Sequence, residues 1–337
     1  MAGIEIRSGR LSKSSRLYRH LTDRHCASAM NISRHSVFIL RRISASHDVF
    51  VLTDNRSGSE FILKSFAQRH ARASSLERYL DNEYDSLKRV SEIGIGDHHW
   101  RVVRPVCRDR KALFFVEEKA KGVSLDHHLH RELAGGAGRL DKKLDLLAGF
   151  FARLHRKTAT GQRVNASSMR KELDRHAIQS WQAGGLSHGD MREALSLSRR
   201  WCGSPAIRHA TSSLTHGDAT PANFICDGDR LFVIDLERSK YRDPAYDLGM
   251  MAGELFAAAL SARSNPYDAD PCIGRLYRKY AGNFSDWKGT FNRLTARNPL
   301  YMANSLLRMS RNGYFSPEHR RRIGFYALEC LRSRVPG

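Results

Sequence analysis

Residues Leu214–Gly249 read LTHGDATPANFICDGDRLFVIDLERSKYRDPAYDLG, and this stretch decides the fold. Its centre, Asp227-Gly228, predicts a tight β-hairpin turn, because this dipeptide readily adopts the backbone that such turns need. A short strand, Asn223–Cys226, is expected before the turn, and a return strand, Arg230–Leu236, after it. The stretch is therefore expected to form a hairpin with polar residues at its open end.

Three oxygen-bearing side chains are expected to meet at this hairpin. Pairing across a two- or three-residue loop places Asn223 opposite Phe232 or Val233. Asn223 then lies near Asp235, at the end of the hairpin remote from its turn. Asp218 stands five residues before Asn223, in the loop that leads in. The hairpin thus gathers two carboxylates and one carboxamide.

This set of side chains suits magnesium chemistry. Mg²⁺ prefers hard oxygen ligands, usually one or two protein groups together with water and substrate phosphates. We expect Asn223 and Asp235 to hold Mg²⁺, which leaves Asp218 to orient or deprotonate an attacking hydroxyl. Glu237 fits two roles equally: contact with a second Mg²⁺, or a salt bridge to Arg238 or another arginine. Few protein groups suffice, because phosphoryl transfer needs mainly positioning and charge neutralisation.

The spacing resembles the catalytic signature of aminoglycoside phosphotransferase-like and choline kinase-like small-molecule kinases. His216-Gly217-Asp218, then Asn223 five residues after Asp218 and Asp235 twelve later, carry the resemblance, and Asp247 resembles the structural aspartate that follows. The resemblance implies an α+β, two-lobed protein-kinase-like fold and the use of ATP with Mg²⁺. It also implies that Asp218 is catalytic and that His216 serves it by bracing the catalytic loop.

A second copy of the HGD motif occurs at Ser187-His188-Gly189-Asp190. Five residues past Asp190 stands Leu195, where the signature needs Asn, and no Ile-Asp-x-acid strand follows. We interpret this copy as a polar loop without chemistry.

The N-terminal part offers an independent test of the kinase interpretation. Lys64 lies in a strand-like segment, Glu60–Phe66, and a kinase needs a strand lysine for the nucleotide phosphates. On the next predicted helix, 74–91, Glu83 falls within the apolar stripe of leucines and Val90. A buried carboxylate requires a partner. The sequence therefore predicts a Lys64–Glu83 ion pair, as the resemblance also implies.

The remaining nucleotide contacts are less marked in the sequence. The loop Ser44–Asp48 takes the place of a glycine-rich phosphate loop, and we expect Ser46 to contribute there. The segment Phe115–Glu118 resembles the hinge between the lobes, with the backbone at Glu117 bonded to adenine. The resemblance thus assigns Lys64, Glu83, Ser46 and Glu117 to the nucleotide.

Two absences indicate a small acceptor. The resembling protein kinases carry Lys or Arg two residues after the catalytic Asp, where this chain has Thr220. Asp247 follows Asp235 too closely for a long activation segment and peptide platform. The expected acceptor is a hydroxyl of a small molecule, bound against the helical part of the chain.

Composition bounds the possible partners. The 337 residues carry 56 Lys and Arg against 35 Asp and Glu, a formal net charge of +21, which favours anionic partners and an anionic acceptor. Basic and aromatic residues are not interleaved, so nucleic acid is not expected. No apolar run is long enough for a membrane span. Six scattered cysteines without a CxxC pair indicate a reducing, cytoplasmic setting.

The predicted organisation has three parts. Residues 1–35 are a basic, loosely ordered or peripheral extension, 36–118 an N-terminal lobe with a sheet and one helix, and 119–337 a mainly helical C-terminal lobe. Within the last part, helical periodicity predicts these segments: 125–133, 140–157, 247–262, 271–281, 299–312 and 317–332.

Other functions stay open at this point. Lipopolysaccharide-core sugar kinases share a similar catalytic layout, and the basic charge fits their anionic acceptor and peripheral contact with an anionic membrane. A kinase-fold binding protein without turnover is the other alternative, supported only by the missing glycine-rich loop. An aminoglycoside acceptor is not expected, because pockets for such polycations are typically acidic.

Overall fold

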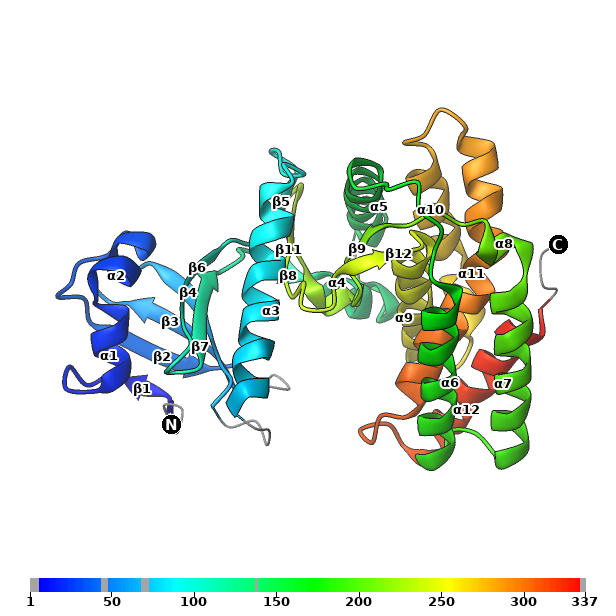
Figure 1. Cartoon of the computed structure of the whole chain (residues 1–337), viewed down its shortest axis with the longest axis horizontal. Coiled ribbons are helices and arrows are strands. Elements are labelled where there is room, and N and C mark those ends of the chain that lie inside the picture. The colour runs from blue at the N-terminus through cyan, green and yellow to red at the C-terminus, as the bar shows by residue number, and fades with distance from the viewer. Residues whose placement is uncertain (1–5, 44–47, 68–72, 137–138, 334–337) are drawn as a thin grey trace. The chain divides into compact units, whose positions relative to one another are not determined.

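The computed structural model describes residues 6–43, 48–67, 73–136 and 139–333. The chain divides into two compact units (Figure 1). The first comprises Met1–Lys121 together with Phe232–Glu237, and the second comprises Gly122–Leu231 together with Arg238–Gly337. Each unit buries its own set of apolar side chains.

The first unit is built on a six-stranded antiparallel sheet with the order β1-β2-β3-β4-β7-β6. The predicted strand Glu60–Phe66 is present as β4, because its aromatic and β-branched residues favour a strand. One helix, α3, follows β4 as the sequence predicts. The bounds are β1 Gly9–Arg10, β2 Phe38–Arg42, β3 Asp48–Asp54, β4 Glu60–Ser65, α3 Ala73–Glu92, β5 Trp100–Val102, β6 Pro105–Asp109 and β7 Phe114–Glu118.

The prediction that residues 1–35 are loosely ordered is wrong for the described residues of this segment. Helices α1 (Arg16–Leu21) and α2 (Arg24–Met30) bury Leu17, Leu21 and Met30 in a core shared with the sheet. Each helix begins with a side-chain cap, from Ser15 and Asp23 respectively. Both helices are too short for a periodic pattern to stand out among the many basic residues.

The second unit is mainly helical. Helix α11 packs against α9 and α12, α6 against α7, and α5 against α10 (Figure 1). The helices are α4 Leu125–Leu133, α5 Leu140–Lys157, α6 Ala166–Gln182, α7 His188–Gly203, α8 Pro205–Arg208, α9 Ala245–Arg263, α10 Asp270–Ala281, α11 Trp287–Ser310 and α12 Pro317–Arg332, with the 3-10 turns η1 Pro221–Asn223 and η2 Pro266–Ala269. The α+β class and the helical C-terminal part are as predicted.

Short strands of this unit flank residues 216–223, the segment that carries Asp218. β8 (Val123–Ser124) pairs with β10 (Phe224–Asp227), and β9 (Ser213–Thr215) pairs with β12 (Lys240–Arg242). The predicted turn after Asp227 is present, with Gly228 at φ +57°, and β11 (Arg230–Val233) follows it. Asn223 ends the turn η1 instead of beginning a strand.

Two helical predictions need correction. The second HGD copy is no loop: Ser187 caps α7, and its side chain and that of Asp190 bond each other's backbone N–H groups in a capping box. Helix α11 begins at Trp287 and continues through Pro299, which the sequence analysis took as the start. The proline lies inside the helix because tertiary packing outweighs its local cost.

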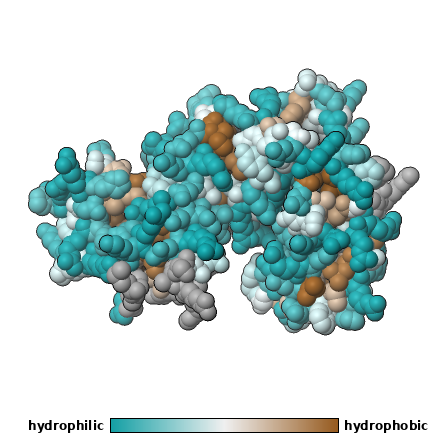
Figure 2. Space-filling view, viewed as in Figure 1, coloured by the Kyte–Doolittle hydropathy of each residue, from teal (hydrophilic) through white to brown (hydrophobic). Residues whose placement is uncertain are grey.

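The surface seen in Figure 2 is mostly hydrophilic, with hydrophobic residues in separate patches. Among the described residues, no helix combines the length and apolar character that crossing a membrane requires.

Candidate active site

The predicted Lys64–Glu83 pair is present in the first unit. Lys64 lies on β4 and Glu83 on the buried face of α3. Lys64 Nζ donates to Glu83 Oε1 over 2.6 Å. The Lys64 side chain is 14% exposed and that of Glu83 is 4% exposed. The pair is therefore nearly buried and holds an ammonium group at a fixed place above the sheet.

Glu117 adds a second carboxylate to this lysine. In the β4–β7 ladder, Lys64 stands opposite Phe115, so Glu117 is its diagonal neighbour on the same face. Its Oε1 lies 3.3 Å from Lys64 Nζ, and its Oε2 is buried and has no hydrogen-bond partner among the residues that the structure describes. From the sequence, only the backbone at Glu117 was expected to have a role, and this side-chain contact was not predicted. The strand register carried the signal for it.

Burial and charge act in opposite directions on these groups. Burial lowers the pKa of Lys64, but the carboxylates of Glu117, Glu83 and Asp235 outweigh it and raise that pKa above 10.5. The lysine therefore stays charged. Burial raises the pKa of Glu117 from 4.5 to about 7, because Lys64 offsets only part of the desolvation cost.

We expect Glu83→Gln to weaken ATP binding about tenfold, because Lys64 loses one charged hydrogen bond that fixes it. Calorimetric titration with ATP measures the change. Glu60→Gln is the matched control, since Glu60 pairs with Lys119 over 2.8 Å on an exposed part of the same sheet. Equal ATP affinity in the Glu83 variant and the control would contradict a positioning role for Glu83.

Glu117 also predicts a pH dependence of stability. Its pKa is about 7 in the folded chain and 4.5 ordinarily, so the folded state binds more protons between these values. Stability therefore falls as pH rises through this window. We expect Glu117→Gln to be more stable than the parent at about pH 8 and similar to it at about pH 5. Urea unfolding at both pH values measures this, and a parent that gains stability with pH in this window would disprove it.

The other predicted residues of the first unit lie on the segment Phe232–Glu237 or outside the described part. Asp235 has φ +59°, a left-handed backbone that non-glycine residues adopt rarely and often at functional sites. Glu237 follows two residues later and is partly buried. Ser46 lies outside the described residues.

Asp247 anchors the loop of the second unit that carries His216, Gly217 and Asp218, which we call the catalytic loop after the role expected of Asp218. Asp247 Oδ2 accepts from the His216 N–H over 2.7 Å, and its Oδ1 accepts from the Gly217 N–H over 3.0 Å. His155 Nε2 lies 3.1 Å from Asp247 Oδ2, and its Nδ1 lies 3.0 Å from the Tyr280 hydroxyl. Both Asp247 and His155 are almost fully buried. The loop is thus held by a buried, hydrogen-bonded carboxylate.

Gly217 permits this loop shape. Its φ is +81°, and a Cβ there would lie 2.1 Å from the carbonyl oxygen of Arg238. The next residue is held too, because the Asp218 N–H donates to His216 Nδ1 over 3.3 Å. Asn223 Nδ2 donates to the Asp218 carbonyl oxygen over 2.9 Å. That bond leaves the Asn223 amide oxygen available as a hard ligand.

The Asp218 carboxylate meets two arginines that the sequence analysis did not identify. Arg308, on α11, donates from Nη1 to Asp218 Oδ1 over 2.7 Å and from Nη2 to Glu254 Oε1 over 2.7 Å. Arg238 Nε lies 3.9 Å from Asp218 Oδ2. Burial raises the pKa of Glu254, and Arg308 offsets part of that shift. Arg308 thus bridges two carboxylates and fixes the orientation of Asp218.

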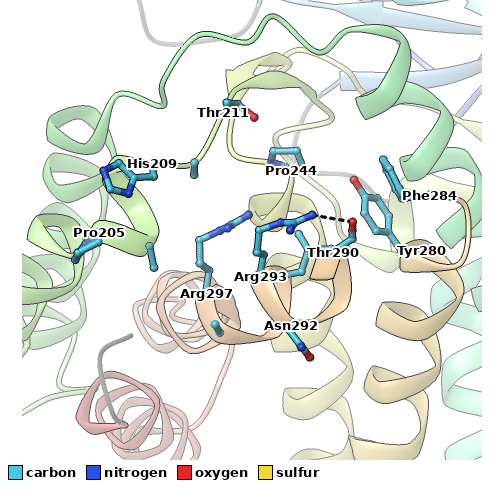
Figure 3. A pocket seen from close by; sticks show the side chains of 14 residues that line it. Pro205, His209, Thr211, Pro244, Tyr280, Phe284, Thr290, Asn292, Arg293 and Arg297 are labelled. Carbon is cyan, nitrogen blue, oxygen red and sulfur yellow. Dashed lines mark hydrogen bonds between the residues drawn. The ribbon is translucent and has the colours of Figure 1, made fainter. Parts of the chain in front are cut away.

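Two cavities of this unit have no residue of the catalytic loop among their lining residues. One, of about 630 Å³, lies among residues of α8, α10 and α11, where Arg293 donates to Thr290 over 3.1 Å (Figure 3). The other, of about 190 Å³, includes Glu172 and Tyr246 in its lining. Within the described residues, no group of three or more His, Cys, Asp or Glu side chains could hold a metal ion. A Mg²⁺ held by one amide and one carboxylate would need no such group.

A family model matches the sequence, and several solved structures are similar to this one. Residues 39–282 match the model of the phosphotransferase enzyme family. A choline kinase from Cryptosporidium parvum is similar in structure, with TM-score 0.62, 12% identity and coverage of 93% of this chain and 94% of that one. An ethanolamine kinase from Plasmodium vivax gives TM-score 0.57 and 13% identity, with 87% and 81% covered.

The ADP-bound aminoglycoside phosphotransferase APH(2'')-Ib gives TM-score 0.55 and 14% identity, with 94% of this chain and 97% of that chain covered. No curated protein sequence matches the chain significantly. The structural matches show the kinase-like fold, and the family model covers most of the chain. The chain belongs to the phosphotransferase enzyme family.

Proposed function

We propose that this chain is an ATP- and Mg²⁺-dependent kinase that transfers the γ-phosphate to a hydroxyl of a small molecule. The observation that carries the proposal is the anchored catalytic loop: Asp247 fixes the backbone at His216 and Gly217, and Asn223 bonds the Asp218 carbonyl. This arrangement supports Asp218 as the group that orients or deprotonates the acceptor hydroxyl. His216 serves as a brace of the loop.

The nucleotide half of the proposal rests on the first unit. Lys64, a charged and nearly buried donor beside Glu83, suits the phosphates of ATP. Glu117 limits the freedom of the same ammonium group. Ser46 and the backbone at Glu117 remain proposed nucleotide contacts from the sequence alone. The ADP-bound relative and the kinases named for choline and ethanolamine support a nucleotide cofactor and a small acceptor.

The donor set fits Mg²⁺. The Asn223 amide oxygen and the Asp235 carboxylate are hard oxygen ligands, and Mg²⁺ takes few protein groups beside phosphate and water. Glu237 is a further proposed ligand. When bound, the ion would neutralise charge on the phosphates.

Transfer of label from γ-labelled ATP to a pool of small alcohols tests the function. We expect transfer with Mg²⁺, none after chelation, and loss of transfer in Asp235→Asn. Asp229→Asn, at an exposed position in the turn before β11, is the matched control. Transfer that survives chelation, or that Asp235→Asn leaves intact, would contradict the proposed role of the metal.

A further inference from the structure

A cavity of about 320 Å³ opens beside the catalytic loop of the second unit. Gly217, which precedes Asp218, is part of its wall, and so is Arg308, which contacts the Asp218 carboxylate. The volume is that of a small-molecule site. We call it the cationic pocket, after six of its lining residues: Arg175, Arg238, Lys240, Arg242, Arg308 and Arg311.

The charge of the cationic pocket is not balanced by its lining. Six of the ten lining residues are Arg or Lys, and Glu172 is the single acid among them. Its Oε1 already accepts from Arg242 over 3.2 Å and from the Tyr246 hydroxyl over 2.5 Å, and its Oε2 lies 3.8 Å from Lys240 Nζ. This one carboxylate therefore serves several donors and cannot balance the charge of all six cations.

Two of the arginines have no carboxylate partner within the described part of the chain. Arg311 donates to the Arg308 carbonyl oxygen over 3.2 Å and to the side chain of Gln179, both of which are neutral. Arg175 forms no ion pair there and extends from the exposed face of α6. Neither guanidinium group is therefore neutralised by a carboxylate of the described residues, and both can pair with an anionic ligand.

Burial and repulsion among the cations lower the pKa values of Arg311 and Lys240. Burial lowers the pKa of Arg311, and the neighbouring charges of Arg308, Arg238 and Arg175 lower it further. Burial and Arg242 likewise lower the pKa of Lys240, against the pull of Glu172. A bound anion would relieve this repulsion, which no apolar or cationic ligand could do.

We infer that the cationic pocket binds a phosphate group of the acceptor, so that the substrate is a phosphorylated compound with a free hydroxyl. The inference rests on the proposed function, because it concerns the acceptor of the same reaction. A phosphomonoester carries close to two negative charges and three acceptor oxygens. It can therefore bind several guanidinium groups at once, whereas a carboxylate ligand has one negative charge and two oxygens. Choline, a cation, would be repelled by the same wall.

Calorimetric titration of the full chain, kept in Mg²⁺ and ADP, with inorganic phosphate tests the pocket itself. We expect phosphate to bind and the affinity to fall with added salt. Arg175→Gln and Arg311→Gln should each weaken Kd about tenfold, the effect of one charged hydrogen bond. Arg199→Gln, at an exposed position of α7 outside the pocket, removes the same charge and should bind as the parent does.

The inference is overturned if the parent does not bind phosphate in this titration. It is also overturned if phosphate binds equally well to the parent and to both pocket variants. Two variants are used so that a folding defect in one does not decide the outcome.

Turnover with paired acceptors separates this inference from the proposed function. Glycerol, ribose and glucose are each compared with their phosphomonoesters, with ADP formation as the readout. We expect higher kcat/KM for a phosphorylated member, reduced in Arg311→Gln but not in Arg199→Gln. Preference for the phosphate-free members would contradict the inference about the pocket but not the proposed kinase function. Absence of Mg²⁺-dependent ATP binding would sink the proposed function instead.

The phosphate could belong to a soluble compound or to a lipid headgroup. Sedimentation with phosphatidylcholine vesicles, with and without phosphatidic acid, distinguishes these sources. Binding to phosphatidic acid that Arg175→Gln and Arg311→Gln weaken indicates a headgroup. Preference for soluble phosphomonoesters without vesicle binding indicates a soluble acceptor. Vesicle binding that is the same in the parent and both variants would assign the anion affinity to other surfaces and count against the pocket.

Discussion

Asp218→Asn is expected to lower kcat for phosphate transfer by about 10²–10⁴-fold, the usual contribution of a positioned acid or base. The amide cannot take a proton from the acceptor hydroxyl, whereas the shape of the side chain is kept. The loop should also keep its shape, because His216 and Gly217 bond Asp247 through their backbones and not through Asp218. ATP binding is therefore expected to persist.

The chain supplies its own control for this variant. Asp190 stands in the second HGD copy, where it belongs to the capping box of α7. Asp190→Asn should leave kcat close to that of the parent and cost at most about 1 kcal/mol of stability. Steady-state kinetics and an ATP titration of both variants measure the difference. Near-normal kcat in Asp218→Asn, or an equal loss in both, would contradict the assigned role.

Asp247→Ala is expected to cost about 3–5 kcal/mol of unfolding free energy, the range for breaking a buried charged network. The change leaves the backbone N–H groups of His216 and Gly217 and the ring of His155 without their acceptor. Activity should fall as well, because the catalytic loop loses its anchor. Denaturant unfolding measures the first effect and steady-state kinetics the second.

The protonation of Asp247 gives this prediction a pH signature. Burial alone would raise the pKa of Asp247, but His155, His216 and the Gly217 backbone N–H lower it below 3.8. The stabilisation is therefore complete above 3.8 and is lost as pH falls through the lower, folded-state pKa. The difference between parent and variant should shrink at acid pH.

Asp141→Ala is the control for Asp247→Ala. Asp141 also forms an ion pair, with Arg275 over 3.1 Å, but its side chain is 64% exposed. An exposed pair of this kind contributes about 0–1 kcal/mol. If Asp247→Ala destabilised the chain no more than Asp141→Ala does, Asp247 would not anchor the loop.

Much of the fold could be predicted because its signals are local. Alternation marks the strand β4, and apolar periodicity gave α4 and α5 their observed bounds. Helix α6 was missed, since its buried face combines histidine, alanine and serine with the single large apolar residue Leu173. Helix α7 was missed although it buries Met191, Leu197 and Trp201, because its first residues repeat the HGD motif and were interpreted as a polar loop. Short helices such as α1 owe their order to packing on the sheet, which no local pattern reveals.

Contacts of the candidate site were predictable where they depend on spacing along the chain. Asp218, Asn223 and Asp247 follow one motif, and Lys64 with Glu83 follows from a strand and the stripe of a helix. The contacts of Asp218 with Arg308 were not predictable, because the two residues stand 90 positions apart and meet only through the packing of α11. The side chain of Glu117 was missed because its contact depends on strand register.

The position of the cationic pocket could not be predicted from the sequence. Net charge of +21 favours anionic partners without saying where they bind. Arg175 comes from α6, Lys240 and Arg242 from β12, and Arg311 from the residue after α11. Only the fold brings these charges to one wall beside the catalytic loop.

Calorimetric titration of the full chain with ATP, with and without Mg²⁺, tests the central claim most directly. The account predicts one nucleotide site whose affinity rises with Mg²⁺, and loss of that Mg²⁺ dependence in Asp235→Asn. The absence of ATP binding under both conditions would contradict it and would leave a kinase fold without kinase chemistry.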